Sequence, residues 1–154
     1  MSNCCIHDGE GQGDGIAIIA SSKATLDDNY IHSIAGNGVL VAGEGSEAVL
    51  RNNRIHNGKR AGVIIMAQGK ATLENNVISS HAGFSMAVQN EGTEAVMTGN
   101  RIHSGGSQGL LVLDKAKATL ANNAIIAHAS VGVGVVTGTA VTMPISGVGM
   151  NTIM

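Results

Sequence analysis

The chain repeats itself with a period of 23 or 24 residues, and this period limits its possible folds more than any other feature. Helical solenoids need roughly 30 to 45 residues per repeat and an apolar stripe of helical period, which this chain lacks. A leucine-rich repeat requires an L-x-x-L-x-L pattern, which is also missing. The five copies read A-T-L-D-D-N-Y-I-H at 24–32, A-V-L-R-N-N-R-I-H at 48–56, A-T-L-E-N-N-V-I-S at 71–79, A-V-M-T-G-N-R-I-H at 95–103 and A-T-L-A-N-N-A-I-I at 118–126.

Within each copy apolar residues alternate with polar ones, which is the period of a strand. The sequence therefore predicts an all-β fold, a right-handed single-stranded parallel β-helix with about five full coils and a partial coil at each end. Each coil has three short strands, and equivalent residues stack about 4.8 Å apart. Four inward columns follow: Leu26, Leu50, Leu73, Met97 and Leu120; Ile31, Ile55, Ile78, Ile102 and Ile125; Val39, Val63, Met86, Leu110 and Val133; Val41, Ile65, Val88, Val112 and Val135.

One asparagine recurs in every copy between two inward residues, where the chain must turn. Asparagine tolerates a left-handed backbone, and stacked amides bond along the axis. We therefore expect a structural ladder that makes the turn and fixes the register. Its members are Asn29, Asn53, Asn76, Asn100 and Asn123.

The repeats place the whole chain, 1–154, in one β-helix domain, with clear repeats over 24–135. A partial coil at 4–23 aligns Cys4-Cys5-Ile6-His7 with the N-Y-I-H step and Gly15 to Ile18 with Gly38 to Val41. The segment 136–154 reads as a degenerate coil in which Ser146 and Val148 take the Asn and Ile places. No charged residue follows Lys117, so a membrane span is an alternative. The Gly, Ser and Thr content favours a solenoid end that is exposed or self-associates end to end.

Composition narrows the function classes. Tyr30 and Phe84 are the only Tyr and Phe and Trp is absent, so the core must be narrow and aliphatic. A net charge of −2 gives no global field for nucleic acid or an anionic membrane, so neither is an expected partner. Adjacent Cys4 and Cys5 indicate no disulfide framework, and no leader is visible. These features predict a cytoplasmic location, with the nucleus as an alternative.

The outward positions beside the isoleucine column hold the candidate site. The second and fourth copies present equal Arg-x-His pairs, two coils or roughly 10 Å apart. Lys59 and Arg60 follow the first pair in a turn. Such a basic patch suits an acidic or phosphorylated protein segment, whereas the structural alternative is a solvated face copied by duplication. The candidate binding residues are Arg54, His56, Lys59, Arg60, Arg101 and His103.

Other chemistry finds less support. Asp27, Arg51 and Glu74 form one column of alternating charge that favours correct strand pairing. His32 and His56 are neighbours without a third ligand, and His81 and His128 lie in equivalent turns, so neither a metal nor a cofactor is expected. A polysaccharide-cleaving site would need clustered acids and aromatic platforms, which are missing. An ice-binding face fails because Thr25, Thr72 and Thr119 recur only in alternate coils.

The segments R-N-N-R-I-H-N-G-K-R-A-G-V-I-I, A-T-L-E-N-N-V-I and G-N-R-I-H-S-G resemble the right-handed β-helix repeats of carbohydrate-binding proteins and sugar hydrolases. Within that class they are most similar to the β-helices of eukaryotic F-box substrate adaptors and of the spindle-associated Shc-binding protein. The resemblance covers 4–135 and implies the fold, while fold does not determine function. In F-box adaptors it implies a substrate-presenting module, although no F-box segment is present.

These arguments lead to three hypotheses. The first is a non-catalytic interaction or scaffold module, not an enzyme, that holds a protein partner on the lateral face. The second is a carbohydrate-binding or polysaccharide-cleaving protein, a lyase or hydrolase, which uses the same face. The third is a structural solenoid that associates end to end.

Overall fold

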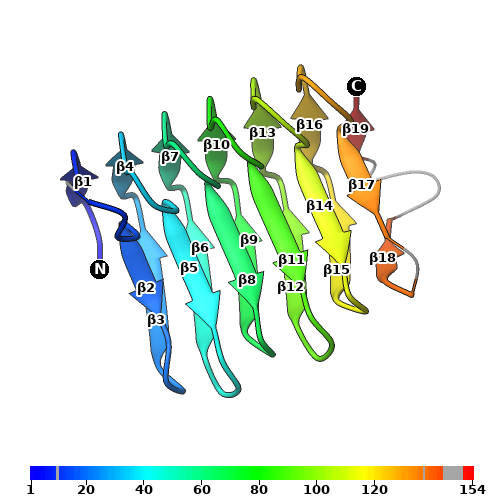
Figure 1. Ribbon diagram of the computed structural model, residues 1–154, viewed down its shortest axis with the longest axis horizontal. Coiled ribbons are helices and arrows are strands. Elements are labelled where there is room, and N and C mark those ends of the chain that lie inside the picture. The colour runs from blue at the N-terminus through cyan, green and yellow to red at the C-terminus, as the bar shows by residue number, and fades with distance from the viewer. Residues whose placement is uncertain (10, 137, 144–150) are drawn as a thin grey trace.

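The chain winds into a parallel β-helix of about six turns (Figure 1). The structure, a computed structural model, describes residues 1–9, 11–136, 138–143 and 151–154. Three parallel sheets run along the axis, and no helix occurs in the described residues. This confirms the all-β solenoid expected from the repeat.

Each coil contributes one strand to each sheet, so the strands of a sheet come from successive coils. Sheet A consists of β3 (Lys23–Asp27), β6 (Glu47–Arg51), β9 (Lys70–Glu74), β12 (Glu94–Thr98), β15 (Lys117–Ala121) and β18 (Ala140–Thr142). Sheet B consists of β1 (Cys5–His7), β4 (Tyr30–His32), β7 (Arg54–His56), β10 (Val77–Ser79), β13 (Arg101–His103), β16 (Ala124–Ile126) and β19 (Thr152–Ile153). Sheet C consists of β2 (Ile16–Ile18), β5 (Val39–Ala42), β8 (Val63–Met66), β11 (Met86–Gln89), β14 (Leu110–Leu113) and β17 (Val133–Val135).

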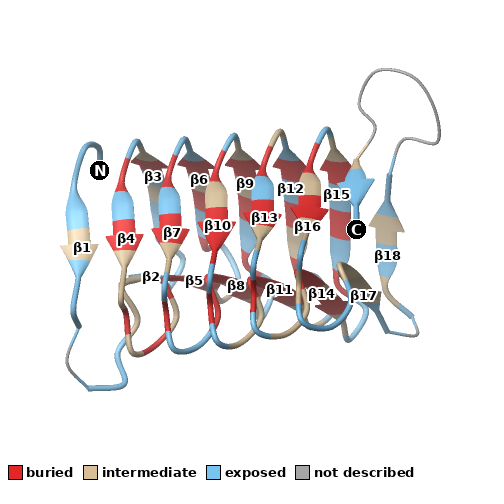
Figure 2. Cartoon of the chain, turned by 90° about the horizontal axis from the view of Figure 1, so that it is seen from above, coloured by how far each residue is buried: buried red, intermediate tan, exposed pale blue. Residues whose placement is uncertain are grey.

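The predicted core columns are inward-facing ladders (Figure 2). Their members are buried at 0–3% exposure up to the fifth coil. Val133 is only partly buried, and Val135 is 52% exposed. These two residues depart from the expectation because β17 is the last strand of sheet C in the described chain, so nothing stacks on it. A further inward column, alanine in every repeat, lies on sheet A; Ala48, Ala71, Ala95 and Ala118 are buried.

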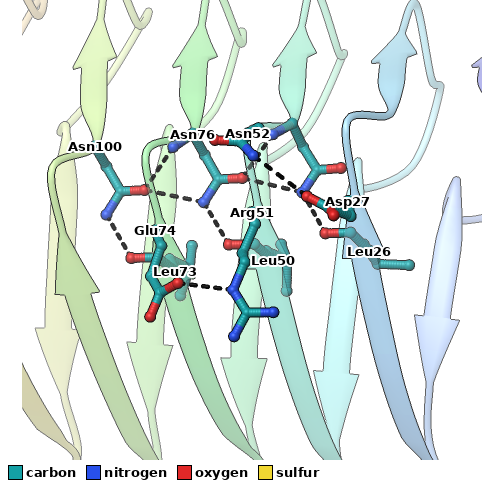
Figure 3. A network of polar contacts seen from close by, with 10 residues as sticks. Leu26, Asp27, Leu50, Arg51, Asn52, Leu73, Glu74, Asn76 and Asn100 are labelled. Carbon is teal, nitrogen blue, oxygen red and sulfur yellow. Dashed lines mark hydrogen bonds and ion pairs between the residues drawn. The ribbon is translucent and has the colours of Figure 1, made fainter. Parts of the chain in front are cut away.

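The asparagine ladder fixes the turn between sheets A and B (Figure 3). The Oδ1 atom of Asn76 accepts hydrogen bonds from the backbone N–H (2.9 Å) and the Nδ2 (3.0 Å) of Asn53. The Nδ2 of Asn76 donates to the Leu50 carbonyl at 2.8 Å and to Oδ1 of Asn100 at 2.9 Å. Every coil repeats this pattern, so the buried amides are satisfied along the axis.

One detail of the ladder prediction was wrong. The ladder asparagines do not have positive φ; the residue before each of them does. The left-handed bend is therefore made by the residue before each asparagine. These residues are Asp28, Asn52, Asn75, Gly99 and Asn122, with φ between 54° and 67°.

The two ends differ in how closely they follow the sequence alignment. At the N-terminus Ile6 pairs with Ile31 and Ile16 with Val39, as expected. At the C-terminus the ladder places belong to Asn151, whose Oδ1 accepts from Asn123, and to Ile153, which pairs with Ile125. Ser146 and Val148, assigned to these places from sequence, lie outside the described residues. Over the described part of the chain, no helix is long and apolar enough to cross a membrane.

Candidate functional site on the outer face of sheet B

The outer face of sheet B carries the two Arg-x-His pairs of the repeat. Arg54 on β7 and Arg101 on β13 are both in register with Val77 of β10 between them. In the next outward column Ser79 lies between His56 and His103. Two cationic and imidazole-bearing strands therefore flank a strand of small side chains, roughly 10 Å apart by strand spacing.

Each outward histidine is held by the residue that follows it. Nδ1 of His103 is 3.0 Å from the Ser104 hydroxyl, and Nδ1 of His32 is 3.0 Å from the Ser33 hydroxyl. Ser33 and Ser104 have φ near +56°, which turns the chain and brings the short polar side chain back to the ring. The sequence signal is a Ser or Asn directly after I-H, which was not used in the prediction.

A stack of rings covers the N-terminal side of this face. The rings of His7 and His32 are stacked with centroids 5.1 Å apart, and those of His32 and His56 with centroids 5.3 Å apart. Tyr30 lies edge-on to both His32 and His56 at 4.9 Å. The Arg54 guanidinium lies over the Tyr30 ring, 5.6 Å from its centroid. Tyr30 thus holds Arg54 and His56 in place, a contact that sequence reasoning missed.

The site favours uncharged imidazoles. Burial lowers the pKa of His103 below its usual value, and electrostatic interactions with Arg101, His128 and Arg54 lower it further. Burial likewise lowers the pKa of His56, with Arg54 and His32 adding to the effect against the opposing Asn57 hydrogen bond. Nε2 of His56 is buried and has no hydrogen-bond partner in the described residues. Because Arg54 acts on both His56 and His103, its charge reaches across the strip of Val77 and Ser79.

Within the described residues, no acidic side chain pairs with the arginines of this face. The strands β4, β7, β10 and β13 contain no Asp or Glu. Among the ion pairs of the described chain, none includes Arg54 or Arg101. The face therefore presents unpaired guanidinium groups that are suited to bidentate contact with carboxylates.

Lys59 and Arg60 lie apart from the face, in the turn that connects β7 to β8. They line a shallow depression together with Phe84, Ile64 and Ala61, and no acidic side chain lines it. The Arg60 guanidinium donates to Oε1 of Gln12 at 2.6 Å. The six predicted binding residues thus fall into two neighbouring groups: four on sheet B and two in this turn. Their role in binding stays a prediction.

Other candidate chemistry is limited. In the described residues, no group of three or more His, Cys, Asp or Glu side chains is arranged to hold a metal ion. Cys4 and Cys5 are free and exposed. The predicted charge column is present on sheet A, where Arg51 donates to Glu74 at 2.7 Å (Figure 3).

Comparisons with known proteins identify the fold. The family model described as "right handed beta helix region" matches residues 1–145. No curated protein matches the sequence. Among solved structures, the periplasmic alginate epimerase AlgG matches 97% of this chain with a TM-score of 0.77, and a double mutant of it matches with 0.84, both at 12% identity. The A-module of a mannuronan C-5 epimerase from Azotobacter vinelandii matches 75% with a TM-score of 0.63 at 23% identity.

The chain spans 38% of the AlgG chain and 34% of the A-module. At these identities the likeness shows the fold. The expectation that the chain is not an enzyme needs correction, because all three neighbours are structures of epimerases. That expectation rested on the lack of paired carboxylates and aromatic platforms in the sequence. The finer resemblance to F-box adaptors found no support among these matches.

Proposed function

Because this chain belongs to the right-handed β-helix family, we propose that it is a carbohydrate-active protein that binds an acidic polysaccharide across β7, β10 and β13. The observation that carries this proposal is the pair of Arg-x-His strands around Val77 and Ser79, with unpaired guanidinium groups and uncharged imidazoles. The folds of the alginate epimerases support a uronate polymer as the ligand class.

The geometry fits a chain of carboxylated sugars laid along the solenoid axis. Arg54 and Arg101 are separated by two strand spacings, about 10 Å, so they contact carboxylates of different sugars or clasp one sugar between them. Val77 and Ser79 leave space at the centre of this strip because both side chains are small. Tyr30 and the cationic turn at Lys59 and Arg60 extend the surface on either side.

The same groups support proton transfer at the carbon beside a carboxylate. An arginine that pairs with the carboxylate stabilises the negative charge that develops when this carbon loses its proton. His103 is the proposed base: its lowered pKa favours the neutral ring near neutral pH, and in the tautomer whose Nδ1–H donates to the Ser104 hydroxyl, Nε2 is free to accept a proton. The C–H bond breaks, its proton moves to Nε2, and its electron pair moves into the carboxylate as an enediolate.

Two outcomes then complete the reaction. Return of a proton to the opposite face of the sugar inverts the carbon, whereas cleavage of the bond to the neighbouring glycosidic oxygen gives an unsaturated sugar. His56 and His103 lie in one outward column of sheet B, so a proton that inverts the carbon comes from solvent on the open side of the sugar, whereas a proton returned by His103 restores the starting configuration.

The test measures binding and turnover of polymannuronate by the purified chain, with a neutral glucan as the ligand control. Nuclear magnetic resonance of the sugar detects inversion, and ultraviolet absorbance detects the unsaturated product. We expect Arg54→Gln or Arg101→Gln to weaken binding roughly 10- to 100-fold. His103→Asn should lower turnover about 10²- to 10⁴-fold with little change in binding.

Arg51→Gln is the matched control, because Arg51 lies on sheet A and is paired with Glu74. It removes the same charge from another face and should leave polymannuronate binding unchanged. Absence of binding by the wild-type chain, or equal losses in Arg51→Gln and Arg54→Gln, would overturn the proposed function.

A further inference from the structure

A column of alternating small and large residues lies three positions after the inward isoleucines. It reads Gly9, Ile34, Gly58, His81, Gly105 and His128. Each large side chain occupies the space left by the glycine of the coil before it. A Cβ on Gly58 would meet Nδ1 of His81 at 2.7 Å, and one on Gly105 would meet Nδ1 of His128 at 2.8 Å. The first pair has an isoleucine in the place of the histidine.

Each of these two histidines bonds the backbone of the preceding coil at two points. The Gly58 N–H donates to Nδ1 of His81 at 3.1 Å, so Nε2 carries the proton and donates to the Ile55 carbonyl at 3.1 Å. His128 repeats the arrangement, with the Gly105 N–H at 3.2 Å and the Ile102 carbonyl at 3.1 Å. Both rings are therefore held in one neutral tautomer by geometry.

The clamped backbone is that of the two Arg-x-His strands. Ile55 lies between Arg54 and His56, and Ile102 lies between Arg101 and His103. Gly58 and Gly105 belong to the turns that follow these strands, and the first of these turns carries Lys59 and Arg60. The strands β4 and β10, which lack the pair, have Gly58 and Gly105 at the clamp position of the next coil. The histidine clamps thus bond β7 and β13, the strands of the proposed site, and neither β4 nor β10.

We propose that His81 and His128 are positioning residues whose neutral imidazoles clamp the turns 57–62 and 104–109, and that acidification releases these turns. A protonated ring carries N–H on both nitrogens, so its Nδ1 faces the glycine N–H as donor against donor. The ring must then leave the turn to satisfy its second N–H. The consequence for polysaccharide binding rests on the proposed function, whereas the opening of the turns does not.

The surroundings of His81 favour its neutral form, as the proposal requires. His81 is 2% exposed, and burial lowers its pKa, with the electrostatic interaction with His56 adding to the effect against the Ile55 hydrogen bond. The titratable neighbours are His56 for His81 and His103 for His128, and Lys59 and Arg60 belong to the clamped turn itself. No acidic group is among the causes that act on His81. An added proton on His81 therefore meets no acidic group that would stabilise it.

The first experiment follows amide hydrogen exchange at Gly58 and Gly105, corrected for intrinsic rates, across pH. Uptake of one proton on opening makes the opening constant of the Gly58 amide rise by up to about tenfold per pH unit below the usual histidine pKa. The Gly36 amide, which donates to Gly13 in a turn without a histidine clamp, is the internal control and should not respond. His81→Gln should remove the response at Gly58 and keep it at Gly105, and His128→Gln the reverse.

If His81→Gln does not fold, His81→Ile places at this position the residue that the first coil has at Ile34. A response at Gly58 that persists in either variant, or no response in the wild-type chain, overturns the clamp.

The second experiment measures polymannuronate binding at neutral and acidic pH. Protonation of His56 and His103 adds positive charge and strengthens binding, so the clamp effect is isolated by comparing wild type with His81→Gln and His128→Gln. We expect the variants to retain more binding in acid than the wild type. Equal pH profiles overturn the link between clamp and site. Amide opening without binding at any pH retains the clamp and overturns the proposed function.

Discussion

The outer faces of sheets A and B come from the same coils, yet their charged side chains are arranged in opposite ways. On sheet A, Lys23 pairs with Glu47 at 3.2 Å, Lys70 with Glu94 at 3.7 Å and Arg51 with Glu74 at 2.7 Å. On sheet B, the arginines and histidines of β7 and β13 have no acidic residue in the strand between them. The charged side chains of sheet A form ion pairs with one another. In the described residues Arg54 and Arg101 of sheet B form none, so their guanidinium groups are available to a ligand.

This difference teaches that duplication alone does not explain the basic face. A residue copied by duplication costs nothing to a solvated strand, but the two unpaired guanidinium groups, two coils or about 10 Å apart, still repel each other. On sheet A the charges alternate in sign between successive coils, so each cation has an acidic neighbour. The departure from that pattern on sheet B is the physical reason to treat it as the site.

We expect the greatest loss of stability from a substitution in the asparagine ladder, which joins sheets A and B. Asn76→Ala leaves the Leu50 carbonyl and the Asn53 N–H without their partners in the buried ladder. At roughly 1–3 kcal/mol for each such group, we expect a loss of about 4 kcal/mol in the free energy of unfolding, measured by chemical denaturation. Asn75→Gly is the control, since Gly99 occupies the equivalent place. A cost no larger than that of the control would contradict the ladder's role.

The second prediction gives the face of sheet B the alternating charges of sheet A. Val77→Glu puts an acid between Arg54 and Arg101, as Asp27 and Glu74 flank Arg51 with opposite charge. We expect polymannuronate binding to fall about 10- to 100-fold, because the new carboxylate pairs with both guanidinium groups. Stability should change by less than about 1 kcal/mol. Val77→Gln separates charge from size, and equal effects of the two variants would refute the electrostatic explanation.

Acid should weaken the clamped strands of sheet B. The folded state holds the pKa of His81 below the usual 6.5, so the unfolded chain binds the proton first. The stability contribution is complete above 6.5 and is lost as pH falls from there through the folded-state pKa, by at most about 1.4 kcal/mol per pH unit. Urea midpoints across pH should show a shallower slope for His81→Gln than for the wild type. Parallel slopes would show that His81 does not titrate on unfolding.

The smallest effect concerns the outer face of sheet A. Lys70→Gln breaks an exposed pair with Glu94, and exposed pairs contribute roughly 0–1 kcal/mol. We expect a change within that range, reduced further by salt, and no change in polymannuronate binding. A larger loss of stability, or any loss of binding, would mean that sheet A also takes part in the site.

Much of the site was open to prediction because strand pairing is in register. Once Ile55 and Ile102 are known to face inward, Arg54, His56, Arg101 and His103 must face outward two coils apart. What escaped prediction are contacts between different columns. The packing of Tyr30 on His56 and Arg54, and the return of Ser104 to His103, depend on side-chain direction and on a left-handed residue that no column predicts.

A strict period forces equivalent residues to stack, so the repeat alone predicts the solenoid, its coil length, its inward columns and its asparagine ladder. Where the period breaks, the next member of the ladder is identified by its contacts. Asn151 follows Asn123 by 28 residues, and its hydrogen bonds with Asn123 place it in the ladder. Only the structure showed that His81 and His128 fill the space over Gly58 and Gly105 and bond the site strands. The sequence period determines which residues stack on one another. The histidine clamps depend instead on the space over Gly58 and Gly105, which only the folded chain reveals.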